Sequence, residues 1–304
     1  MSVASPSASV RTASDASRLA GGLRIALPKG RMQEGVFKLL SDAGIRVGLS
    51  SRGYRPSISL PGVETKILKP QNIIEMLDSG TRDLGFAGAD WASELQADLV
   101  EVLDTGLDRV RVVAAAPASI LVDGQLPSRP LVIASEYSRL TRAFIGVRGV
   151  GDRFVRSYGA TEVFPPEDAD CIIDVTSSGA TLEANNLQIC GDLMESSTRL
   201  YASRAAMADP ARRRDIEDFA MLLGSVLEAR KRVMLELNAP AACLDAIIAV
   251  LPCMRQPTLS QLAGDGGFAV KSAVPRESLP RLIPLLKQRG GTDIVISPLS
   301  QVVA

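Results

Sequence analysis

The chain of 304 residues contains no histidine. Without an imidazole there can be no Ser–His–Asp triad, no Cys–His pair, no imidazole general base and no zinc site with a histidine ligand. Catalysis, if there is any, must use carboxylates, lysine, arginine, hydroxyl groups and backbone amides, or a metal ion held by oxygen.

Cysteine and long apolar runs are also scarce. The four cysteines form no Cys-x-x-Cys pair and disulfide scaffolds are cysteine-dense, so we expect reduced thiols in a cytoplasmic protein. No apolar run is long enough to span a bilayer.

Residues 1–22 are rich in Ser and Ala without a hydrophobic signal core, so we expect a disordered tail, with an organelle transit peptide as the alternative. The 34 basic and 34 acidic side chains cancel, which gives no reason to expect nucleic acid or a membrane as partner.

From residue 23 onward, short apolar runs alternate with helical patterns, which is typical of an α/β protein. The strands expected in the first part of the chain cover 23–27, 65–68, 84–87, 110–116, 131–134 and 171–175. The stretches expected to be helical include 73–77, 141–158 and the long run 209–238. A compact α/β tail follows, with a helix at 241–251, a strand at 268–274, a helix at 279–288 and a strand at 293–297.

The segment from Asp174 to Thr181 carries the strongest chemical signal. An apolar strand ends at Asp174, small hydroxyl residues and Gly179 follow, and a helix is expected to open near Leu182. Such a loop offers backbone N–H groups, hydroxyls and a helix N-terminus to a phosphate monoester, while Asp174 could contact sugar hydroxyls or a metal. Gly179 permits a positive φ and Thr181 can be an N-cap. The same residue types also build a capped strand-to-helix turn without a ligand.

Two further strand-to-helix junctions carry charge. Lys29 and Arg31 flank Gly30 where open sheets bind ligands, and cations at a helix N-terminus oppose its dipole, so an anion would explain them. Exposed basic loops are nevertheless common. Asp90 follows a strand and a glycine turn, where it could be the N-cap of a helix at Trp91 or could meet a ligand amine or hydroxyl across a cleft.

Six segments, in this order, resemble the motifs of the ATP phosphoribosyltransferase family in its long form, the first enzyme of histidine biosynthesis. They are Leu23–Arg31 (LRIALPKGR), 69–73 (KPQNI), 83–90 (DLGFAGAD), 140–142 (LTR), 159–162 (GATE) and 170–187 (DCIIDVTSSGATLEANNL). The chain departs from the family pattern at Lys69 and Asn72, where arginine and aspartate are usual. It departs again at Ser178, which replaces threonine, and at Ala180, which replaces arginine, so a phosphate contact is in doubt there.

The resemblance implies a fold and a reaction. It implies a two-lobed, periplasmic-binding-protein-like catalytic domain over 23–224, with lobe 1 at about 23–108 and 182–224 and lobe 2 at about 109–181. A ferredoxin-like (ACT-like) regulatory domain would follow over 225–304. The reaction joins ATP, through adenine N1, to 5-phosphoribosyl 1-pyrophosphate, with Mg²⁺, and releases phosphoribosyl-ATP and pyrophosphate. Histidine would inhibit it, and the enzyme would be a homo-oligomer between dimer and hexamer.

The resemblance also implies residue roles. The 5′-phosphate would lie on Thr176, Ser177, Ser178, Gly179, Ala180 and Thr181, and the ribose hydroxyls on Asp174. Lys29, Arg31 and Arg52 would offset pyrophosphate or triphosphate charge, with Lys69 and Asp90 orienting ATP. Asp174, Lys29 and Arg31 are the catalytic candidates, and Mg²⁺ would be carried mainly by substrate phosphates. The inhibitor candidates at the "NxP" and "LPGLxSPTxSPL"-like segments are Asn238, Thr258 and Ser260.

Two other classes share parts of this pattern. Solute-binding proteins and effector domains of transcription regulators are also two-lobed, but they need a secretory signal or a helix-turn-helix, and neither is apparent in the sequence. Phosphoribosyltransferases that act on free nucleobases place two adjacent acids before the phosphate loop, whereas here Ile173 precedes Asp174.

Overall fold

The computed structural model describes residues 22–49, 53–264 and 266–303, and the chain separates into two compact units. One unit takes the residues up to Ser41 together with Ile45–Ala220, and the other takes Asp42–Gly44 and the residues from Met221. The division falls inside the helix α7 (Pro210–Lys231). The tail expected over 1–22 lies outside the described residues except for Gly22. No described helix is both long and apolar enough to cross a membrane.

The first unit is built on an eight-stranded sheet in the order β4-β1-β5-β10-β6-β9-β7-β8. Its strands are β1 (Arg24–Pro28), β4 (Glu64–Leu68), β5 (Leu84–Gly88), β6 (Leu99–Pro117), β7 (Val132–Ser135), β8 (Arg153–Arg156), β9 (Cys171–Thr176) and β10 (Leu187–Ser203). Its helices are α1 (Arg31–Asp42), α2 (Pro70–Asp78), α3 (Ala89–Leu95), α4 (Ser138–Arg148), α5 (Ala180–Ala184), α6 (Arg204–Ala208) and the first part of α7. A short hairpin of β2 (Val47–Gly48) and β3 (Ser57–Ile58) and the 3₁₀ turn Thr161–Val163 complete the unit.

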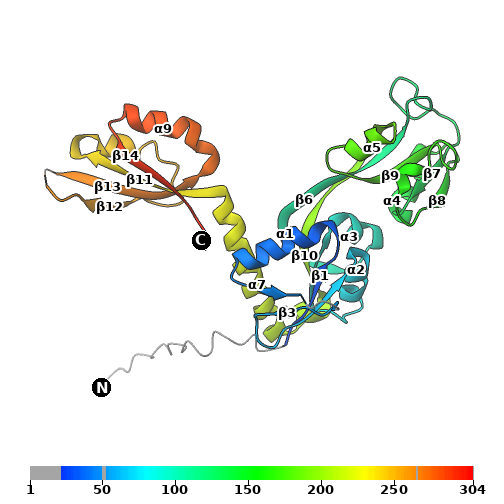
Figure 1. The fold of residues 1–304 in the computed structure, drawn as a ribbon, viewed down its shortest axis with the longest axis horizontal. Coiled ribbons are helices and arrows are strands. Elements are labelled where there is room, and N and C mark those ends of the chain that lie inside the picture. Colours follow the sequence, from blue (N-terminus) through cyan, green and yellow to red (C-terminus); the bar gives the residue numbers. More distant parts are fainter. Residues whose placement is uncertain (1–21, 50–52, 265, 304) are drawn as a thin grey trace, which may run out of the picture. The chain divides into compact units, whose positions relative to one another are not determined.

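Strand direction explains where a ligand can bind. β1 runs parallel to β4 and β5, and β7 runs parallel to β8 and β9. The long strands β6 and β10 pair antiparallel and join these two groups, with β5 on β10 and β9 on β6 (Figure 1). Because β9 runs against β6, and β6 runs in the direction of β5, the carboxyl ends of the two parallel groups point toward each other. Ligands bind at the carboxyl ends of such strands, so this fold directs two sets of loops at one place.

Burial patterns account for most of these elements. β5 is buried at all five positions, as a central strand covered on both faces must be. α1 buries Met32, Val36, Leu39 and Leu40, which recur on one helix face, and the chain then turns at Gly44 with φ of +81°. The α/β fold class is therefore confirmed.

Two predicted helices were wrong in extent, and one predicted strand is part of a much longer one. The helix expected over 141–158 ends at Arg148, where Gly149 takes a left-handed conformation, and β8 follows. The helix expected over 209–238 ends at Lys231. In the strand that follows, Val233, Leu235, Leu237 and Ala239 are buried with a period of two. The strand expected over 110–116 is the last part of the nineteen-residue β6.

The second unit is a ferredoxin-like domain. Its strands β11 (Arg232–Pro240), β12 (Thr258–Gln261), β13 (Gly267–Pro275) and β14 (Thr292–Pro298) form an antiparallel sheet in the order β12-β13-β11-β14. The helices α8 (Leu244–Ile248) and α9 (Leu279–Gln288), each after a 3₁₀ turn, connect the strands in the order β11-α8-β12-β13-α9-β14. Ile247, Leu282 and Leu286 of the helices pack on Leu235 and Val270 of the sheet.

Asp83, directly before β5, connects β1 and α7 to β5 through hydrogen bonds to its buried carboxylate. Its side chain is 1% exposed, and it accepts hydrogen bonds from the backbone N–H of Arg24 (2.8 Å), from the Arg24 guanidinium (2.7 and 3.0 Å) and from Arg212 of α7 (3.0 Å). Burial alone would raise the pKa of Asp83, but the hydrogen bonds and charges of Arg24 and Arg212 outweigh it and hold the pKa below the ordinary value.

We expect Asp83→Ala to lower the unfolding free energy of the first unit by about 3 kcal/mol, because it leaves two guanidiniums without their shared partner. The matched control Asp98→Ala breaks an exposed pair with Arg204 and should cost less than about 1 kcal/mol. Urea unfolding followed by the fluorescence of Trp91, the sole tryptophan, reports on this unit. The lowered pKa means that the Asp83 contribution is complete above the ordinary carboxyl pKa of 3.8 and disappears as the pH falls below it. Equal losses in the two variants would contradict this role.

Candidate active site

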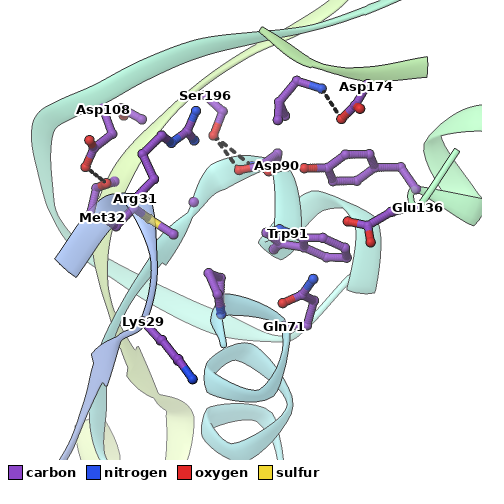
Figure 2. Close-up of a pocket in the computed structure, with 16 residues that line it drawn as sticks. Lys29, Arg31, Met32, Gln71, Asp90, Trp91, Asp108, Glu136, Asp174 and Ser196 are labelled. Carbon is purple, nitrogen blue, oxygen red and sulfur yellow. Dashed lines mark hydrogen bonds between the residues drawn. The ribbon is translucent and has the colours of Figure 1, made fainter. Parts of the chain in front are cut away.

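A cavity of about 190 Å³ lies where the two sets of strand ends meet. Part of its wall follows strand ends, and part lies on the long strands β6 and β10 themselves. Lys29 and Arg31 come after β1, and Gln71 after β4. The remaining lining residues are Met32, Pro70, Gly88, Asp90, Trp91, Asp108, Glu136, Tyr137, Asp174, Val175, Ser196, Ser197 and Thr198. The structure therefore brings Lys29, Arg31, Asp90 and Asp174, four of the residues expected from the sequence, to one cavity (Figure 2).

Asp174 is the most electrostatically perturbed carboxyl group in the cavity. Its pKa is raised to about 6, chiefly by burial and to a smaller extent by the charges of Glu162 and Glu136, against a hydrogen bond from the Val175 N–H (2.7 Å) that lowers the pKa. A carboxyl group with such a pKa in a cavity is typical of a functional position.

The loop after β9 turns at a left-handed glycine and is held by hydrogen bonds from its own amides to its hydroxyl groups. Gly179 adopts φ of +90°, which a glycine takes without strain, and its N–H donates to Thr176 Oγ1 (3.0 Å). The Ala180 N–H donates to Ser178 Oγ (3.4 Å). The helix α5 begins at Ala180 with Gly179 as its N-cap, so the expectation that Thr181 caps a helix near Leu182 was wrong. Ser177, Ser178, Ala180 and Thr181 are exposed.

Asp90 is 5% exposed and makes hydrogen bonds through both carboxylate oxygens. Ser196 Oγ donates to Oδ1 (2.6 Å) and the Tyr137 hydroxyl donates to Oδ2 (2.5 Å), while the Asp90 N–H donates back to Ser196 (3.1 Å). Gly88 is the N-cap of α3, so Asp90 is not the cap of that helix. Asp90 instead ties α3 to β10 and to the segment after β7.

Two further contacts fix α3 to α4. Trp91 stacks on Tyr137 with ring centroids 4.7 Å apart. The Glu94 carboxylate accepts hydrogen bonds from the N–H groups of Arg139 (2.9 and 3.0 Å) and Leu140 (2.9 Å) at the start of α4, which has no side-chain cap of its own. Glu94 therefore caps a helix 45 residues away and holds the two sides of the cavity together.

The other basic candidates differ in position. Lys29 Nζ lies 5.1 Å from the centroid of the Tyr54 ring, a cation–π contact at the edge of the site. Lys69 is exposed and precedes α2, and it does not line the cavity, although its neighbours Pro70 and Gln71 do. Arg52 lies outside the described residues.

Sequence reasoning missed several lining residues. Glu136 and Tyr137 follow β7, so the rule that singled out Lys29 and Asp90 could have found them. Trp91 also lines the cavity, and the side chains of Gln71 and Glu136 lie beside its indole (Figure 2). The Gln71 Oε1 atom is buried without a hydrogen-bond partner in the described part of the chain, so it is a free acceptor.

The three inhibitor candidates share one face of the second sheet. Ser260 pairs with Ala269, which pairs in turn with Asn238, and Thr258 pairs with Lys271 opposite Glu236. This face is opposite to Val233, Leu235 and Leu237, which pack on the helices. Asn238 Nδ2 donates to Asp293 Oδ2 (3.0 Å), and Thr258 lines an open cavity of about 360 Å³ with Lys271 and Met234.

The described residues contain no group of three or more Cys, Asp or Glu side chains that could hold a metal ion. The residues present therefore do not form a magnesium cage of their own.

Burying the charge of Asp174 is unfavourable, so we expect Asp174→Asn to raise the unfolding free energy of the first unit above pH 6. A shift from 3.8 to about 6 corresponds to at most about 3 kcal/mol, with the gain fading as the pH falls through 6 and absent below about 4. Urea unfolding at pH 7.5 and pH 4, followed by Trp91 fluorescence, measures it. Asp168→Asn, in an exposed turn, is the control and should change stability little. A destabilised Asp174→Asn at pH 7.5 would refute the assignment.

Comparisons of this chain with family models and with curated proteins point to the same family. The family description "HisG: ATP phosphoribosyltransferase" matches residues 69–225, and "HisG, C-terminal domain" matches 229–301. The chain is 38% identical over 286 residues to the ATP phosphoribosyltransferase of Pelotomaculum thermopropionicum, covering 92% of this chain and 99% of that one. It is 37% identical over 277 residues to the enzyme of Pelodictyon phaeoclathratiforme, covering 90% and 94%.

A solved structure agrees. The ATP phosphoribosyl transferase (HisG:HisZ) complex from Thermotoga maritima aligns with a TM-score of 0.60 at 25% identity, covering 68% of this chain and 98% of that one. The site built from the strand ends and the matches over both units lead to one conclusion: this chain belongs to the ATP phosphoribosyltransferase family, the transferases of histidine biosynthesis.

Proposed function

We propose that the chain condenses ATP with 5-phosphoribosyl 1-pyrophosphate, with Mg²⁺, to give phosphoribosyl-ATP and pyrophosphate, and that histidine inhibits it. The observation that supports this most is that Asp174 and the cations Lys29 and Arg31 line one cavity where two sets of strand ends meet, with the 176–181 loop following directly on the strand that carries Asp174. A sugar phosphate and a polyphosphate need this combination of carboxylate, amide and cation.

In the proposed reaction the lone pair of adenine N1 attacks C1′ of the phosphoribosyl group, and the bond from C1′ to the pyrophosphate oxygen breaks with its electron pair on pyrophosphate. Asp174 binds the ribose hydroxyls and stabilises the positive charge that develops at the ribosyl ring. Lys29 and Arg31, with Arg52, offset the charge of the leaving pyrophosphate or of the triphosphate. The chain thus acts by positioning and electrostatics, and adenine N1 needs no general base.

One wall of the cavity suits the adenine of ATP, the second substrate. Trp91 offers an aromatic face and Gln71 Oε1 a free acceptor beside it, which suits the ring and the amino group of adenine. Asp90 and Lys69 are assigned to orient ATP, Asp90 through the lone pairs left over from Ser196 and Tyr137. Mg²⁺ would arrive on the substrate phosphates. We place the enzyme in the cytoplasm as a homo-oligomer between dimer and hexamer.

The direct experiment measures pyrophosphate release from ATP and 5-phosphoribosyl 1-pyrophosphate with Mg²⁺, with each substrate omitted in turn. We expect turnover only with both. A chain that binds either substrate without releasing pyrophosphate would be a binding module, and the proposed reaction would be wrong.

Asp174→Asn should lower kcat/KM by about 100-fold or more, since it removes a charge that acts on the transition state. In the wild type, activity should fall as the pH drops below about 6, where Asp174 takes up a proton. This loss of activity at low pH, the acid limb of the profile, should be missing from the variant. A smaller loss that remains would come from protonation of the substrate phosphates. Asp168→Asn should retain the wild-type rate and profile. An unchanged acid limb in Asp174→Asn would contradict the role of this carboxylate.

Inhibition by histidine is assigned to Asn238, Thr258 and Ser260. Thr258→Val and Asn238→Ala should each weaken inhibition about tenfold, the effect of losing one buried hydrogen bond, and should leave turnover without histidine unchanged. Gln288→Ala, at the end of α9, is the control. Inhibition constants within twofold of wild type in both variants would place the inhibitor elsewhere.

A further inference from the structure

A second cavity, of about 370 Å³, adjoins the first and shares Ser196 and Ser197 with it. None of the loop residues Thr176–Thr181 lines the first cavity, where Asp174 lies, but Ser177 lines the second. At the end of β9, Asp174 therefore lines the first cavity, and Ser177 of the following loop lines the second. A ligand that contacts both must extend across the shared serines.

Strand register places Arg109 beside this loop. Arg111 of β6 pairs with Thr176, the last residue of β9. Arg109 lies two residues earlier on β6, past the last residue of β9 in this antiparallel register and at an irregularity in the pairing of β6 with β10. Arg109, Arg111 and Ser177 all line the second cavity.

Three arginines, Arg109, Arg111 and Arg199, line this cavity, and they differ in their ion pairs. Arg111 pairs with Asp192 at 2.7 Å, and Arg199 pairs with Glu101 at 2.5 Å. Arg109 is exposed and has no carboxylate within 4.0 Å among the residues that the structure describes. Its charge is therefore available to a ligand.

Two acids, Asp104 and Glu195, also line the cavity. Asp104 accepts hydrogen bonds from Ser197 Oγ (2.7 Å) and from the Gly106 N–H (2.8 Å), and Arg199 lies 3.9 Å away. Glu195 lies opposite Arg111 in the β6–β10 ladder. The charge of Arg109 helps to lower the pKa of Asp104, but among the described residues Arg109 makes no ion pair within 4.0 Å, which distinguishes it from Arg111 and Arg199.

We propose that the second cavity holds the 5′-phosphate of the phosphoribosyl substrate and that the Arg109 guanidinium binds this phosphate from the strand side while the loop binds it from the other. The proposal rests on the proposed function, since it takes the ribose to lie on Asp174. A planar guanidinium can donate two parallel hydrogen bonds to a phosphate. Ala180, the first residue of α5, brings no cation from the loop side, so the strand supplies it.

The test compares Arg109→Met with Arg153→Met, an exposed arginine on the edge strand β8 that lines neither cavity. We expect Arg109→Met to raise KM for 5-phosphoribosyl 1-pyrophosphate by about 10- to 30-fold, while KM for ATP and kcat stay within twofold. Ribose 5-phosphate should compete with this substrate correspondingly less well, whereas ribose should compete equally in both variants. Arg153→Met should match the wild type.

A rescue variant separates a phosphate contact from loss of structure. Ala180 is exposed, so Ala180→Arg in the Arg109→Met background can restore a cation to the same phosphate from the loop side. We expect it to recover at least a third of the lost affinity for ribose 5-phosphate, measured by calorimetry. Ala180→Arg alone should change this affinity by less than threefold, because Arg109 already provides the charge.

Three results would overturn the proposal. They are equal KM values in Arg109→Met and Arg153→Met, an equal rise in KM for ATP, and failure of Ala180→Arg to restore any ribose 5-phosphate binding. Failure of the proposed function looks different, because the wild type would then release no pyrophosphate. In that case the calorimetric comparison of ribose 5-phosphate with ribose still decides whether Arg109 binds phosphate.

Discussion

The antiparallel pairing of β6 with β10 is the constraint on which the rest of the first unit depends. These strands of nineteen and seventeen residues carry a parallel group at each end and orient the two groups against each other. The meeting of Lys29, Asp90 and Asp174 at one cavity then follows from strand direction, since loops at facing carboxyl ends must meet. The contacts of α3 with the start of α4, through Asp90, Trp91 and Glu94, fix the distance between the two sides.

Electrostatics in this site follows from what the sequence lacks. With no imidazole available, charge placement and hydrogen bonding must supply the catalysis, and the proposed transfer to adenine N1 requires nothing else from the protein. Asp174 is kept partly desolvated, which makes its charge costly to the fold but effective on a substrate cation. Asp83, buried more deeply and placed just before β5 in the other parallel group, shows the opposite case, in which two arginines make the charge stabilising. A net charge of zero thus conceals strongly charged local sites.

Much of this arrangement could be predicted from the sequence, and the exceptions have physical causes. Strand ends carrying Lys29, Asp90 and Asp174 were recognisable because buried parallel strands are continuous apolar runs and turns need glycine. The long strands β6 and β10 were not, because their bulges at several positions break the period of two. β11 was mistaken for helix because it follows α7 without a break, and only the alternation after Lys231 marks it.

Within the site, the sequence predicted residues but not their partners. Asp90 was a candidate for a ligand contact, but no local pattern indicates that Tyr137 and Ser196, 47 and 106 residues away, donate to its oxygens. The same holds for Glu94, which caps a helix of the opposite side. Long-range hydrogen bonds of this kind depend on sheet order, and sheet order was not predictable from local periodicity.

The central claim is that one substrate extends from Asp174 to the loop of Thr176–Thr181 across the meeting strand ends. The most direct measurement is an experimental structure of the chain with 5-phosphoribosyl 1-pyrophosphate and Mg²⁺ bound. The account predicts ribose hydroxyls within hydrogen-bond distance of Asp174 and the 5′-phosphate on the amides of the loop, with pyrophosphate toward Lys29 and Arg31. A ribose away from Asp174, or a 5′-phosphate bound at Lys29 and Arg31 instead of the loop, would contradict it.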